Sequence, residues 1–418
     1  MMSSPTQRVL RHILPNPPQA IGVAVSGGGD SMALLDIVHS TRSQHGMAVS
    51  AITVDHGLRP ASQAEAARVA AYCDARGIPH TVARWTDWSG RGNLQDAART
   101  ARYRLIGEWA NANGIAHVAM GHTRDDQAET VLMRLARGAG VDGLAAMTPR
   151  RLRNTITWMR PMLDVGRAEL RAYLRARDID WIDDPSNEDP QFDRVKARKA
   201  LALLEPLGIT PEALAQVAQN MADARKALGW HSFLAARKMI TVDAGAVSID
   251  AKKYRTLPDE IARRLIVQAL GWIGGAAYPP RREPVRGMIE ALKAGRGATV
   301  DGCHADAVGG RIWIFRELNA VKDETAAPDE LWDARWRLSA EAGRPDNAAI
   351  HVRALGDEGL AQCPDWRASG RPHVVLRSTP AVWEGDRVIA APLANHPAAW
   401  RAELDPGDDA FFAALLSH

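Results

Sequence analysis

Six residues between an apolar run and a helical pattern have the composition of a phosphate-binding turn. The stretch Ser26-Gly27-Gly28-Gly29-Asp30-Ser31 follows "IGVAV" and precedes "MALLDIVHS". Where a strand passes through a glycine-rich turn into a helix, backbone N–H groups and the positive helix end face an anion. The lysine of a Walker A loop is absent, and Asp30 would repel phosphate unless a divalent cation lay between them. The turn therefore indicates phosphate chemistry with magnesium at Asp30; the alternative is an ordinary turn capped by Asp30 or Ser31.

A group of carboxylates forms the second candidate for chemistry. In "GHTRDDQAET", residues 121 to 130, a strand runs into the start of a helix. Glu129 lies four residues after Asp125 and three after Asp126, so the carboxylates share one helical surface, which suits a cation. The alternative is that acidic residues simply favour the helix dipole. His122 is either a nucleotide contact or a structural histidine.

Two other stretches are expected near the same site. Asp55 ends the strand-like run "AVSAITVD" and either coordinates magnesium, orients a substrate or caps the next turn. Arg59 either holds a phosphate through a bidentate fork or is a solvated loop residue. The helix from Leu94 places Arg99, Arg102 and Tyr103 on one face, which suits a nucleotide or RNA, with a solvated face as the alternative.

Positive charge is concentrated between Thr148 and Asp178, where arginines alternate with Trp158 and Tyr173, and Trp181 follows just beyond. Arginines pair with phosphates, and aromatic rings stack on unpaired bases. The segment therefore predicts a surface that faces RNA, although a solvated basic face has the same composition.

The glycine-rich turn matches at every fixed position the SGGxDS loop of the N-type ATP pyrophosphatases, the PP-loop family, which this chain resembles. Six further stretches resemble the tRNA(Ile)-lysidine synthetases of that family over roughly residues 21 to 198. They are "VDHGLR" (54 to 59), "GNLQDAARTARY" (92 to 103), "GHTRDDQAET" (121 to 130), "RGAGVDGL" (137 to 144), "RPML" (160 to 163) and "WIDDPSNED" (181 to 189). "RGATVDGC" (296 to 303) resembles a signature of a later domain, and the final domain matches loosely.

This resemblance implies a ligation in two steps. The C2 carbonyl oxygen of the wobble cytidine, in a tRNA(Ile) with a CAU anticodon, attacks the α phosphate of ATP and gives an adenylylated base and pyrophosphate. The ε-amine of free L-lysine then attacks C2 and expels AMP. The lysidine formed pairs with adenine, and decoding changes from Met to Ile.

The resemblance also implies roles for individual residues. The implied ATP contacts are Ser26, Gly27, Gly28, Gly29, Asp30, Ser31 and His122, with magnesium on Asp30. The implied catalytic residues are Asp30, Asp55, Arg99, Asp126 and Glu129, of which Asp126 and Glu129 also bind lysine. The implied tRNA contacts are Arg160, Arg194 and Arg198. Val195 and Ala197 depart from the family pattern, and the sequence does not choose which carboxylate deprotonates the amine.

Two other functions stay open at this point. A tRNA thiolation enzyme of the same ATP-cleaving class would need a thiol relay or a cluster. Cys73 falls inside a predicted helix and is interpreted as a core residue, and no second cysteine occurs in the first domain. A nucleotide- and RNA-binding module without catalysis would not need carboxylates beside the loop.

The elements that position these residues alternate between strand and helix from Ile21 to about Met147. Strands are expected at 21–26, 48–55, 80–85 and 117–121, and helices at 31–45, 62–76 and 94–113. This alternation predicts an α/β fold with a doubly wound parallel sheet and a ligand site at the carboxyl ends of the strands. A strand-like run at 154–163, a helix at 165–177 and a loop before a further helix follow.

At 418 residues the chain is too long for one core,. We predict a catalytic domain over residues 1–205, a mostly helical tRNA-binding domain over 206–318 and a small α+β tRNA-binding domain over 319–418. A net charge of +3 does not by itself indicate nucleic-acid binding. Cys73, Cys303 and Cys363 are too far apart for a zinc knuckle or a disulfide framework,. No stretch resembles a signal peptide or membrane span, so we expect a cytoplasmic protein without membrane contacts. The oligomeric state is open, a homodimer included.

Overall fold

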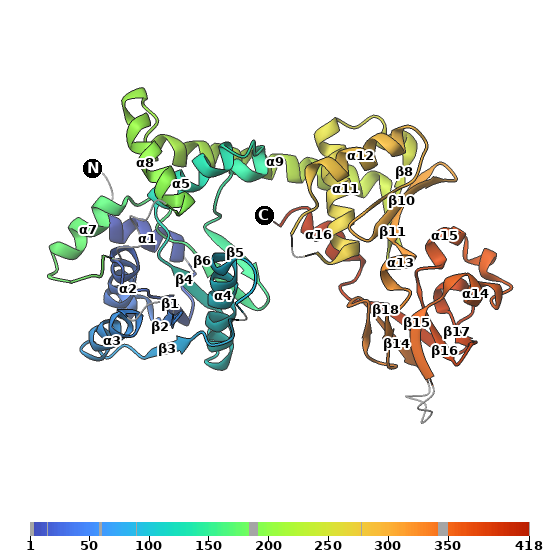
Figure 1. The fold of residues 1–418 in the computed structure, drawn as a ribbon, viewed down its shortest axis with the longest axis horizontal. Helices are drawn as coiled ribbons and strands as arrows, with labels where there is room; N and C mark the ends of the chain where they lie inside the picture. Colours follow the sequence, from blue (N-terminus) through green and yellow to red (C-terminus); the bar gives the residue numbers. More distant parts are fainter. Residues whose placement is uncertain are drawn as a thin grey trace. The chain divides into compact units, whose positions relative to one another are not determined.

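The computed structural model describes residues 4–14, 16–57, 61–88, 90–183, 191–276, 278–341 and 350–417. Arg59 and most of "WIDDPSNED" lie outside these residues. The chain divides into two compact units, Met1–Arg225 and Lys226–His418, which are drawn in Figure 1. The division of the second of these into two domains stays a prediction.

A six-stranded, mainly parallel sheet forms the centre of the first unit, in the order β3-β2-β1-β4-β6-β5. Its strands are β1 (Ala20–Ala24), β2 (Ala48–Asp55), β3 (His80–Arg84), β4 (His117–Met120), β5 (Arg150–Arg153) and β6 (Ile156–Met159). Neighbours from β3 to β6 run parallel, and β5 pairs with β6 antiparallel. The predicted α/β class and parallel sheet are thus confirmed; β5 was not anticipated.

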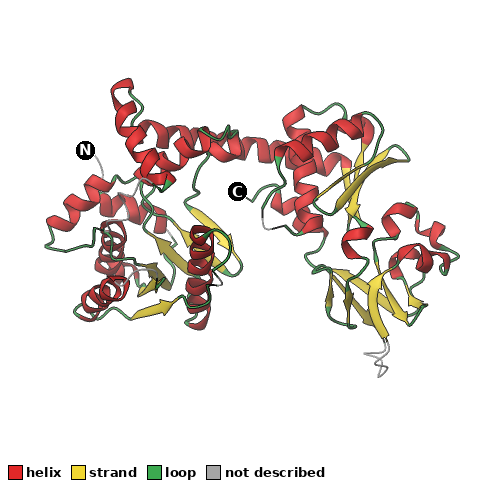
Figure 2. Ribbon diagram, in the orientation of Figure 1, coloured by secondary structure: helices red, strands yellow, loops and turns green. Residues whose placement is uncertain are grey.

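Helices cover both faces of this sheet, as Figures 1 and 2 show. The helices of the first unit are α1 (Pro5–Ile13), α2 (Gly29–Thr41), α3 (Ala61–Asp74), α4 (Leu94–Ala112), α5 (Arg124–Leu135), α6 (Val141–Leu144), α7 (Arg167–Arg175) and α8 (Asp193–Leu204). Helix α9 (Pro211–Met239) begins in this unit and ends in the second. Because both faces are covered, β1 is an apolar run, and β2 carries Ser50 and Thr53 without the strict polar alternation of a half-exposed strand,.

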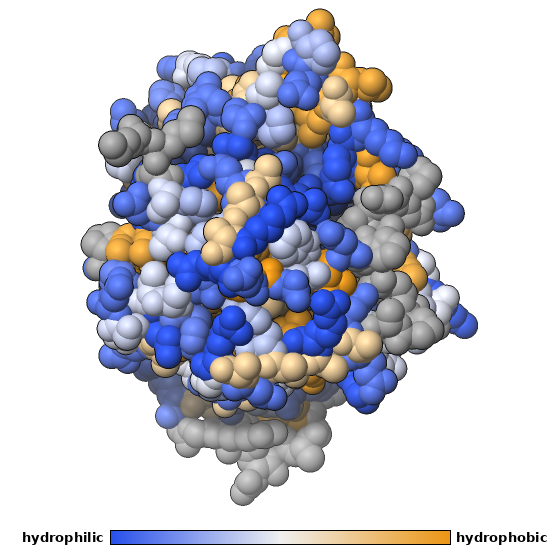
Figure 3. All heavy atoms as spheres, turned by 90° about the vertical axis from the view of Figure 1, so that its left-hand side faces the viewer, coloured by the Kyte–Doolittle hydropathy of each residue, from blue (hydrophilic) through white to orange (hydrophobic). Residues whose placement is uncertain are grey.

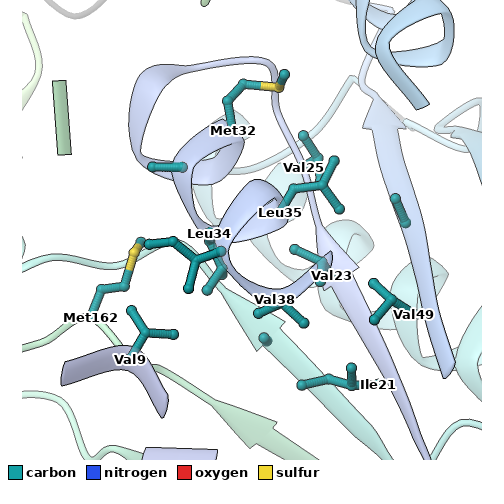
Figure 4. Packing of buried hydrophobic residues seen from close by; sticks show 14 of the residues in the cluster. Val9, Ile21, Val23, Val25, Met32, Leu34, Leu35, Val38, Val49 and Met162 are labelled. Atoms are coloured by element: carbon teal, nitrogen blue, oxygen red, sulfur yellow. The ribbon is translucent and has the colours of Figure 1, made fainter. Parts of the chain in front are cut away.

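Two clusters of buried side chains lie on the two faces. One joins α1, α2, α3 and α7 to the sheet, and the other joins α4 to the opposite face. Figure 4 shows the first cluster, in which Leu34, Leu35 and Val38 of α2 lie among Val9, Ile21, Val23, Val49 and Met162. Helix α2 is buried over most of its length, so the turn that precedes it is attached to a closely packed helix.

The second unit contains three antiparallel sheets, of five, four and three strands. Its strands are β7 (Ile240–Asp243), β8 (Ala246–Asp250), β9 (Ala298–Val300), β10 (Cys303–Val308), β11 (Arg311–Arg316), β12 (Thr325–Ala326), β13 (Leu331–Trp332), β14 (Trp336–Ala340), β15 (Ile350–Ala354), β16 (Pro380–Glu384), β17 (Arg387–Ala390) and β18 (Trp400–Leu404). Its helices are α10 (Ala251–Tyr254), α11 (Asp259–Gly274), α12 (Arg282–Lys293), α13 (Leu318–Val321), α14 (Gly356–Ala361), α15 (His373–Leu376) and α16 (Asp408–Ala414).

One hairpin in this unit departs from the expected helical texture. Strands β7 and β8 pair antiparallel through a turn at Ala244 and Gly245, both of which have positive φ. That backbone is the one which two-residue hairpin turns require. The short apolar runs around it are compatible with either a strand or a buried helix, so sequence periodicity did not identify them.

None of the described helices is both long and apolar enough to cross a bilayer. The face drawn in Figure 3 is mostly hydrophilic, and its hydrophobic residues occur in small separate areas.

Candidate active site

The predicted phosphate loop, residues 26–31, connects β1 to α2 and is held by its own hydroxyl groups. The Ser31 hydroxyl donates to the Gly28 carbonyl oxygen at 2.9 Å and accepts from the Ser26 backbone N–H at 3.1 Å. Gly27 has a φ of +84°, which favours glycine,. The first N–H groups of α2 have no acceptor within the helix, so this end can bind an anion.

The end of β4 touches the phosphate loop directly. A Cβ atom on Gly121 would lie 3.0 Å from Ser31 Cα and 3.1 Å from the Ser31 nitrogen. Strands β1 and β4 are neighbours in the sheet. From β1 the chain continues to β2 and β3 on one side of this pair, and from β4 it continues to β5 and β6 on the other, so the strand order switches between β1 and β4. Open α/β sheets bind ligands at such a switch point.

Four carboxylates and one arginine meet beside this loop, and we refer to Asp30, Asp125, Asp126, Glu129 and Arg167 as the carboxylate cluster. The side chain of Arg167 has one nitrogen near each of three carboxylates. Its Nε is 3.2 Å from Asp30 Oδ2, one Nη is 3.5 Å from Asp126 Oδ1, and the other is 3.6 Å from Glu129 Oε1. The backbone N–H of Arg167 donates to Asp125 Oδ2 at 2.7 Å.

The two α5 carboxylates have further partners. Asp126 Oδ2 accepts from the Thr123 backbone N–H at 2.8 Å, which caps the helix and fixes the carboxyl group,. Arg194 lies 3.6 Å from Asp126 Oδ1, and Arg198 donates to Glu129 Oε1 at 3.0 Å. Glu129 is 1% exposed, and its Oε2 has no hydrogen-bond partner among the described residues. A buried oxygen of this kind is an acceptor available to a substrate cation.

Burial changes the protonation of this cluster. It raises the pKa of Asp30 to about 6, although the charge of Arg167 opposes the change. Burial, followed by the charge of Asp126, raises the pKa of Glu129 above its ordinary value. The charges of the neighbouring arginines therefore do not offset the burial of Asp30 and Glu129,.

His122 lies close enough to Asp126 and Arg99 for their charges to act on it. Burial lowers the pKa of His122 to about 3, so the imidazole is neutral at physiological pH. Its buried Nδ1 has no partner within the described residues. Arg99 is exposed and lies 5.3 Å from the Tyr103 ring centroid. No ion pair to Arg99 occurs in the described part of the chain, so its charge is available to a phosphate.

The hydrogen-bond partners of Asp55 lie outside the carboxylate cluster. Its carboxylate accepts hydrogen bonds from the Ser62 side chain and from the Gly57 backbone N–H, the latter at 2.9 Å, and these bonds lower its pKa. The structure thus gives Asp55 the capping role that was one of the alternatives. Its catalytic role stays a prediction.

Of the aromatic residues predicted to face RNA, Trp158 is buried and Tyr173 is partly buried with a partner inside the protein. Trp158 is 3% exposed and packs on Tyr103 with ring centroids 4.7 Å apart. The Tyr173 hydroxyl donates to Asp36 at 2.7 Å. The prediction that Trp158 stacks on bases is wrong, because β6 is an internal strand covered by α4.

Arg160 is also buried. Its guanidinium group donates to the Thr148 carbonyl oxygen at 3.0 Å and to the Tyr103 hydroxyl at 3.3 Å. These bonds tie the end of β6 to α4 and to the residues before β5. The expected tRNA contact at Arg160 is not tested by this arrangement and stays a prediction.

Arg167 is the site residue that sequence reasoning missed. It follows Gly166 at the start of α7 within a segment rich in arginine, so nothing in its local sequence distinguishes it. The position depends on long-range pairing: Thr123 bridges Met162, and the Arg124 backbone N–H donates to Val165. Only this pairing places the start of α7 beside the start of α5.

The donor set is compatible with magnesium at Asp30. The described residues contain no group of three or more His, Cys, Asp or Glu side chains that could hold a metal ion alone. Magnesium, however, is commonly bound through one or two carboxylates together with substrate phosphates. Asp30 beside an anion-binding loop fits that pattern.

Comparison with known proteins gives consistent matches. Residues 2–204 match the family model described as the PP-loop domain. The chain is 50% identical over 402 residues to tRNA(Ile)-lysidine synthase of Ruegeria pomeroyi, covering 96% of this chain and 95% of that protein. It is 34% identical to the enzyme of the same name from Wolbachia pipientis wMel, covering 90% and 89%, and 35% identical to that of Rhizobium meliloti, covering 82% and 79%.

Proposed function

Because this chain belongs to the tRNA(Ile)-lysidine synthase family, we propose that it ligates free L-lysine to C2 of the wobble cytidine of tRNA(Ile), using ATP. It is an ATP-dependent ligase with a PP-loop domain. The substrate tRNA carries a CAU anticodon, and the products are lysidine, AMP and pyrophosphate. The cytoplasm, where tRNA and free lysine meet, is the proposed location.

In the first step, the cytidine C2 oxygen attacks the α phosphate of ATP. The phosphate loop and the N-terminus of α2 supply N–H groups to the pyrophosphate that leaves. Asp30 would hold magnesium, which offsets charge on the phosphates when bound. Arg99 and neutral His122 are the proposed contacts for the remaining phosphate oxygens.

In the second step, Asp126 and Glu129 bind the ε-ammonium group of lysine. The buried, unpartnered Oε2 of Glu129 is the observation that carries this proposal. An amine must lose a proton before it can attack C2. We propose Glu129 as the acceptor, because burial raises its pKa, whereas the pKa of Asp126 is lowered despite its burial by the positive charges near it and by the Thr123 N–H,.

The tRNA contacts are proposed at exposed arginines. The side chains of Arg194 and Arg198 on α8 are 44% and 41% exposed and lie beside the carboxylate cluster. From there they can reach both a phosphate of the anticodon loop and the lysine-binding carboxylates. The bases of that loop are already unpaired, so presenting one to the site costs less than opening a duplex.

Thiolation of tRNA is less compatible with these residues. Cys73 is fully buried, and burial raises the pKa of its thiol to about 11, so it is a poor nucleophile,. Cys303 and Cys363 are buried too. A sulfur relay would need a reactive thiol near the phosphate loop.

The test is a reaction of the protein with a tRNA(Ile) transcript, labelled lysine and ATP. We expect label in the tRNA together with equal amounts of AMP and pyrophosphate. A transcript with uridine at the wobble position is the matched control and should take up no label. Incorporation that depends on sulfur, or binding of ATP and tRNA without turnover, would contradict the proposal.

A further inference from the structure

Arg167 connects the two halves of the site through a single side chain. Its Nε faces Asp30 in the first turn of α2, and its two Nη atoms face Asp126 and Glu129 on α5. The first carboxylate belongs to the nucleotide half and the other two belong to the lysine half. The guanidinium group therefore lies where both substrates would bind. It also neutralises part of the negative charge that lysine would contact.

These contacts are suited to exchange. At 3.5 and 3.6 Å, the two contacts with the α5 carboxylates are longer than usual charge-assisted hydrogen bonds of about 2.7–2.9 Å,. The side chain is 20% exposed, so it has a route toward solvent. Its backbone is held firmly, because the Arg167 N–H donates to Asp125 at 2.7 Å. The guanidinium can therefore change partners while the start of α7 stays in place.

Lysine and Arg167 would share one oxygen, Asp126 Oδ1, and would lie on the two different oxygens of the Glu129 carboxyl group. An ammonium group that binds Asp126 Oδ1 and Glu129 comes close to the Nη atoms now facing them. These two carboxylates already face Arg194 and Arg198, so an ammonium group added beside the Arg167 guanidinium group would be repelled by it. Lysine binding thus requires Arg167 to withdraw from α5.

The phosphates of ATP offer the alternative partner. Nε of Arg167 already lies 3.2 Å from Asp30, which is part of the phosphate loop. A polyphosphate in that loop stays negatively charged even with one magnesium ion bound, and it binds a planar guanidinium group well. A nucleotide would draw the side chain toward the loop and away from α5.

We propose that Arg167 is a gate that keeps the lysine-binding carboxylates occupied until nucleotide phosphates take over its guanidinium group. This inference rests on the proposed lysine site at Asp126 and Glu129. The gate makes nucleotide and lysine binding mutually favourable, because one displacement serves both ligands. The order also suits the chemistry, since lysine is needed only after the cytidine has been adenylylated.

The test measures lysine binding by calorimetry to the full chain, alone and with magnesium and α,β-methylene-ATP, which cannot be cleaved between the α and β phosphates. For the unmodified protein, we expect the analogue to strengthen lysine binding by about 10-fold, a typical coupling between two sites. Adenosine, which has no phosphates, should leave lysine binding unchanged.

Variants at Arg167 separate the gate from a structural role. Arg167→Met should bind lysine about 10-fold more tightly without nucleotide and lose most of the coupling. Arg167→Lys is the second variant should Arg167→Met not fold; its point charge cannot span three carboxylates, so coupling should still fall. The matched control is Arg171→Met, one turn later on α7, where the arginine pairs with Asp183 at 2.9 Å; coupling should be unchanged.

The outcomes distinguish this inference from the proposed function. Weaker lysine binding in both Arg167 variants, or coupling equal to that of the unmodified protein, overturns the gate and leaves the lysine site intact. No lysine binding by the unmodified protein, or binding unaffected by Glu129→Gln, instead overturns the proposed lysine site, and the gate is then rejected with it.

Discussion

Asp30 is a carboxylate whose ionised form is disfavoured by its surroundings, since burial raises its pKa from 3.8 to about 6. The folded protein therefore binds a proton at Asp30 more readily than the unfolded chain. Above pH 6, where Asp30 is ionised in both the folded and the unfolded protein, its buried charge lowers the free energy of unfolding,. This destabilisation disappears as the pH falls toward 4. A buried carboxylate that destabilises the fold in this way is typical of a residue that binds a cation.

We predict that Asp30→Asn folds, nearly abolishes pyrophosphate release and is more stable than the unmodified protein at pH 8. A difference of about two pKa units corresponds to at most about 3 kcal/mol in the free energy of unfolding. Urea unfolding at several pH values measures it, and the difference should shrink below pH 6. Unchanged turnover would refute the magnesium role of Asp30.

Glu129→Gln is predicted to affect lysine more than ATP. The amide keeps the shape of the side chain. It removes both the negative charge that faces the ammonium group and the proposed proton acceptor. The KM for lysine should rise by at least about 10-fold, the loss of one charge-assisted hydrogen bond, with little change in the KM for ATP. Steady-state kinetics measure both, and equal effects would contradict the assignment to lysine.

Individual residues were predictable from sequence only where local spacing set their position. The i, i+3 and i, i+4 spacing placed Asp125, Asp126 and Glu129 together, because one helix carries all three. Arg167 was not predictable, since its place depends on the pairing of distant segments. Trp158 was misassigned because a buried and a base-stacking tryptophan look alike in a sequence.

At the scale of elements, the close approach of β4 to the phosphate loop gives a direct test. Gly121→Ala would place a methyl group 3.0 to 3.2 Å from the backbone of Asp30 and Ser31, so the loop must shift. We expect ATP affinity to fall by about 10-fold or more while the fold is kept, as a loss of about 1.4 kcal/mol would produce. Binding of the ATP analogue measures the loss.

Gly107→Ala in α4 is the matched control for that substitution. Its nearest neighbour beyond α4 would be Ile156 Cδ1, at an ordinary contact distance of 3.7 Å. Alanine favours a helix over glycine, so stability should rise by about 0.5–1 kcal/mol without a change in ATP affinity. Equal loss of affinity in both variants would show that the effect at Gly121 is not local.

Elements with a strong period were predictable, and short paired strands were not. Strands β1 to β4 and helices α2 to α4 lie within a few residues of the expected ranges, because strand-like runs alternate there with helix-length patterns. Strand β5 consists of four exposed residues, "RRLR", and has no strand pattern of its own. Without β5, strand β6 would be the edge of the sheet, and β5 pairs antiparallel with that edge.

At the scale of the whole molecule, the site residues discussed above all belong to the unit Met1–Arg225. Each unit has its own buried clusters, so each should fold cooperatively when expressed alone. We predict that the fragment 1–225 binds ATP and lysine but modifies tRNA(Ile) much less efficiently than the full chain. Calorimetry and the labelled-lysine assay measure both properties.

The fragment 226–418 is the counterpart of that experiment. It should melt as a folded protein and bind no nucleotide. If the fragment 1–225 bound neither ATP nor lysine although folded, residues of the second unit would be required for the site. Full modification of tRNA(Ile) by the fragment 1–225 would instead rule out a tRNA-binding role for the second unit.

The pairing of β1 with β4 has a consequence for how such enzymes diversify. The phosphate loop follows β1 and α5, the proposed lysine-binding helix, follows β4, so both begin at adjacent hydrogen-bonded strands, roughly 4.8 Å apart,. That spacing is common to all sheets and cannot be tuned by substitution. A descendant that exchanged lysine for another nucleophile would therefore change α5 and the arginines of α7 and α8 that face it, and would inherit the strand pair and its phosphate loop unchanged.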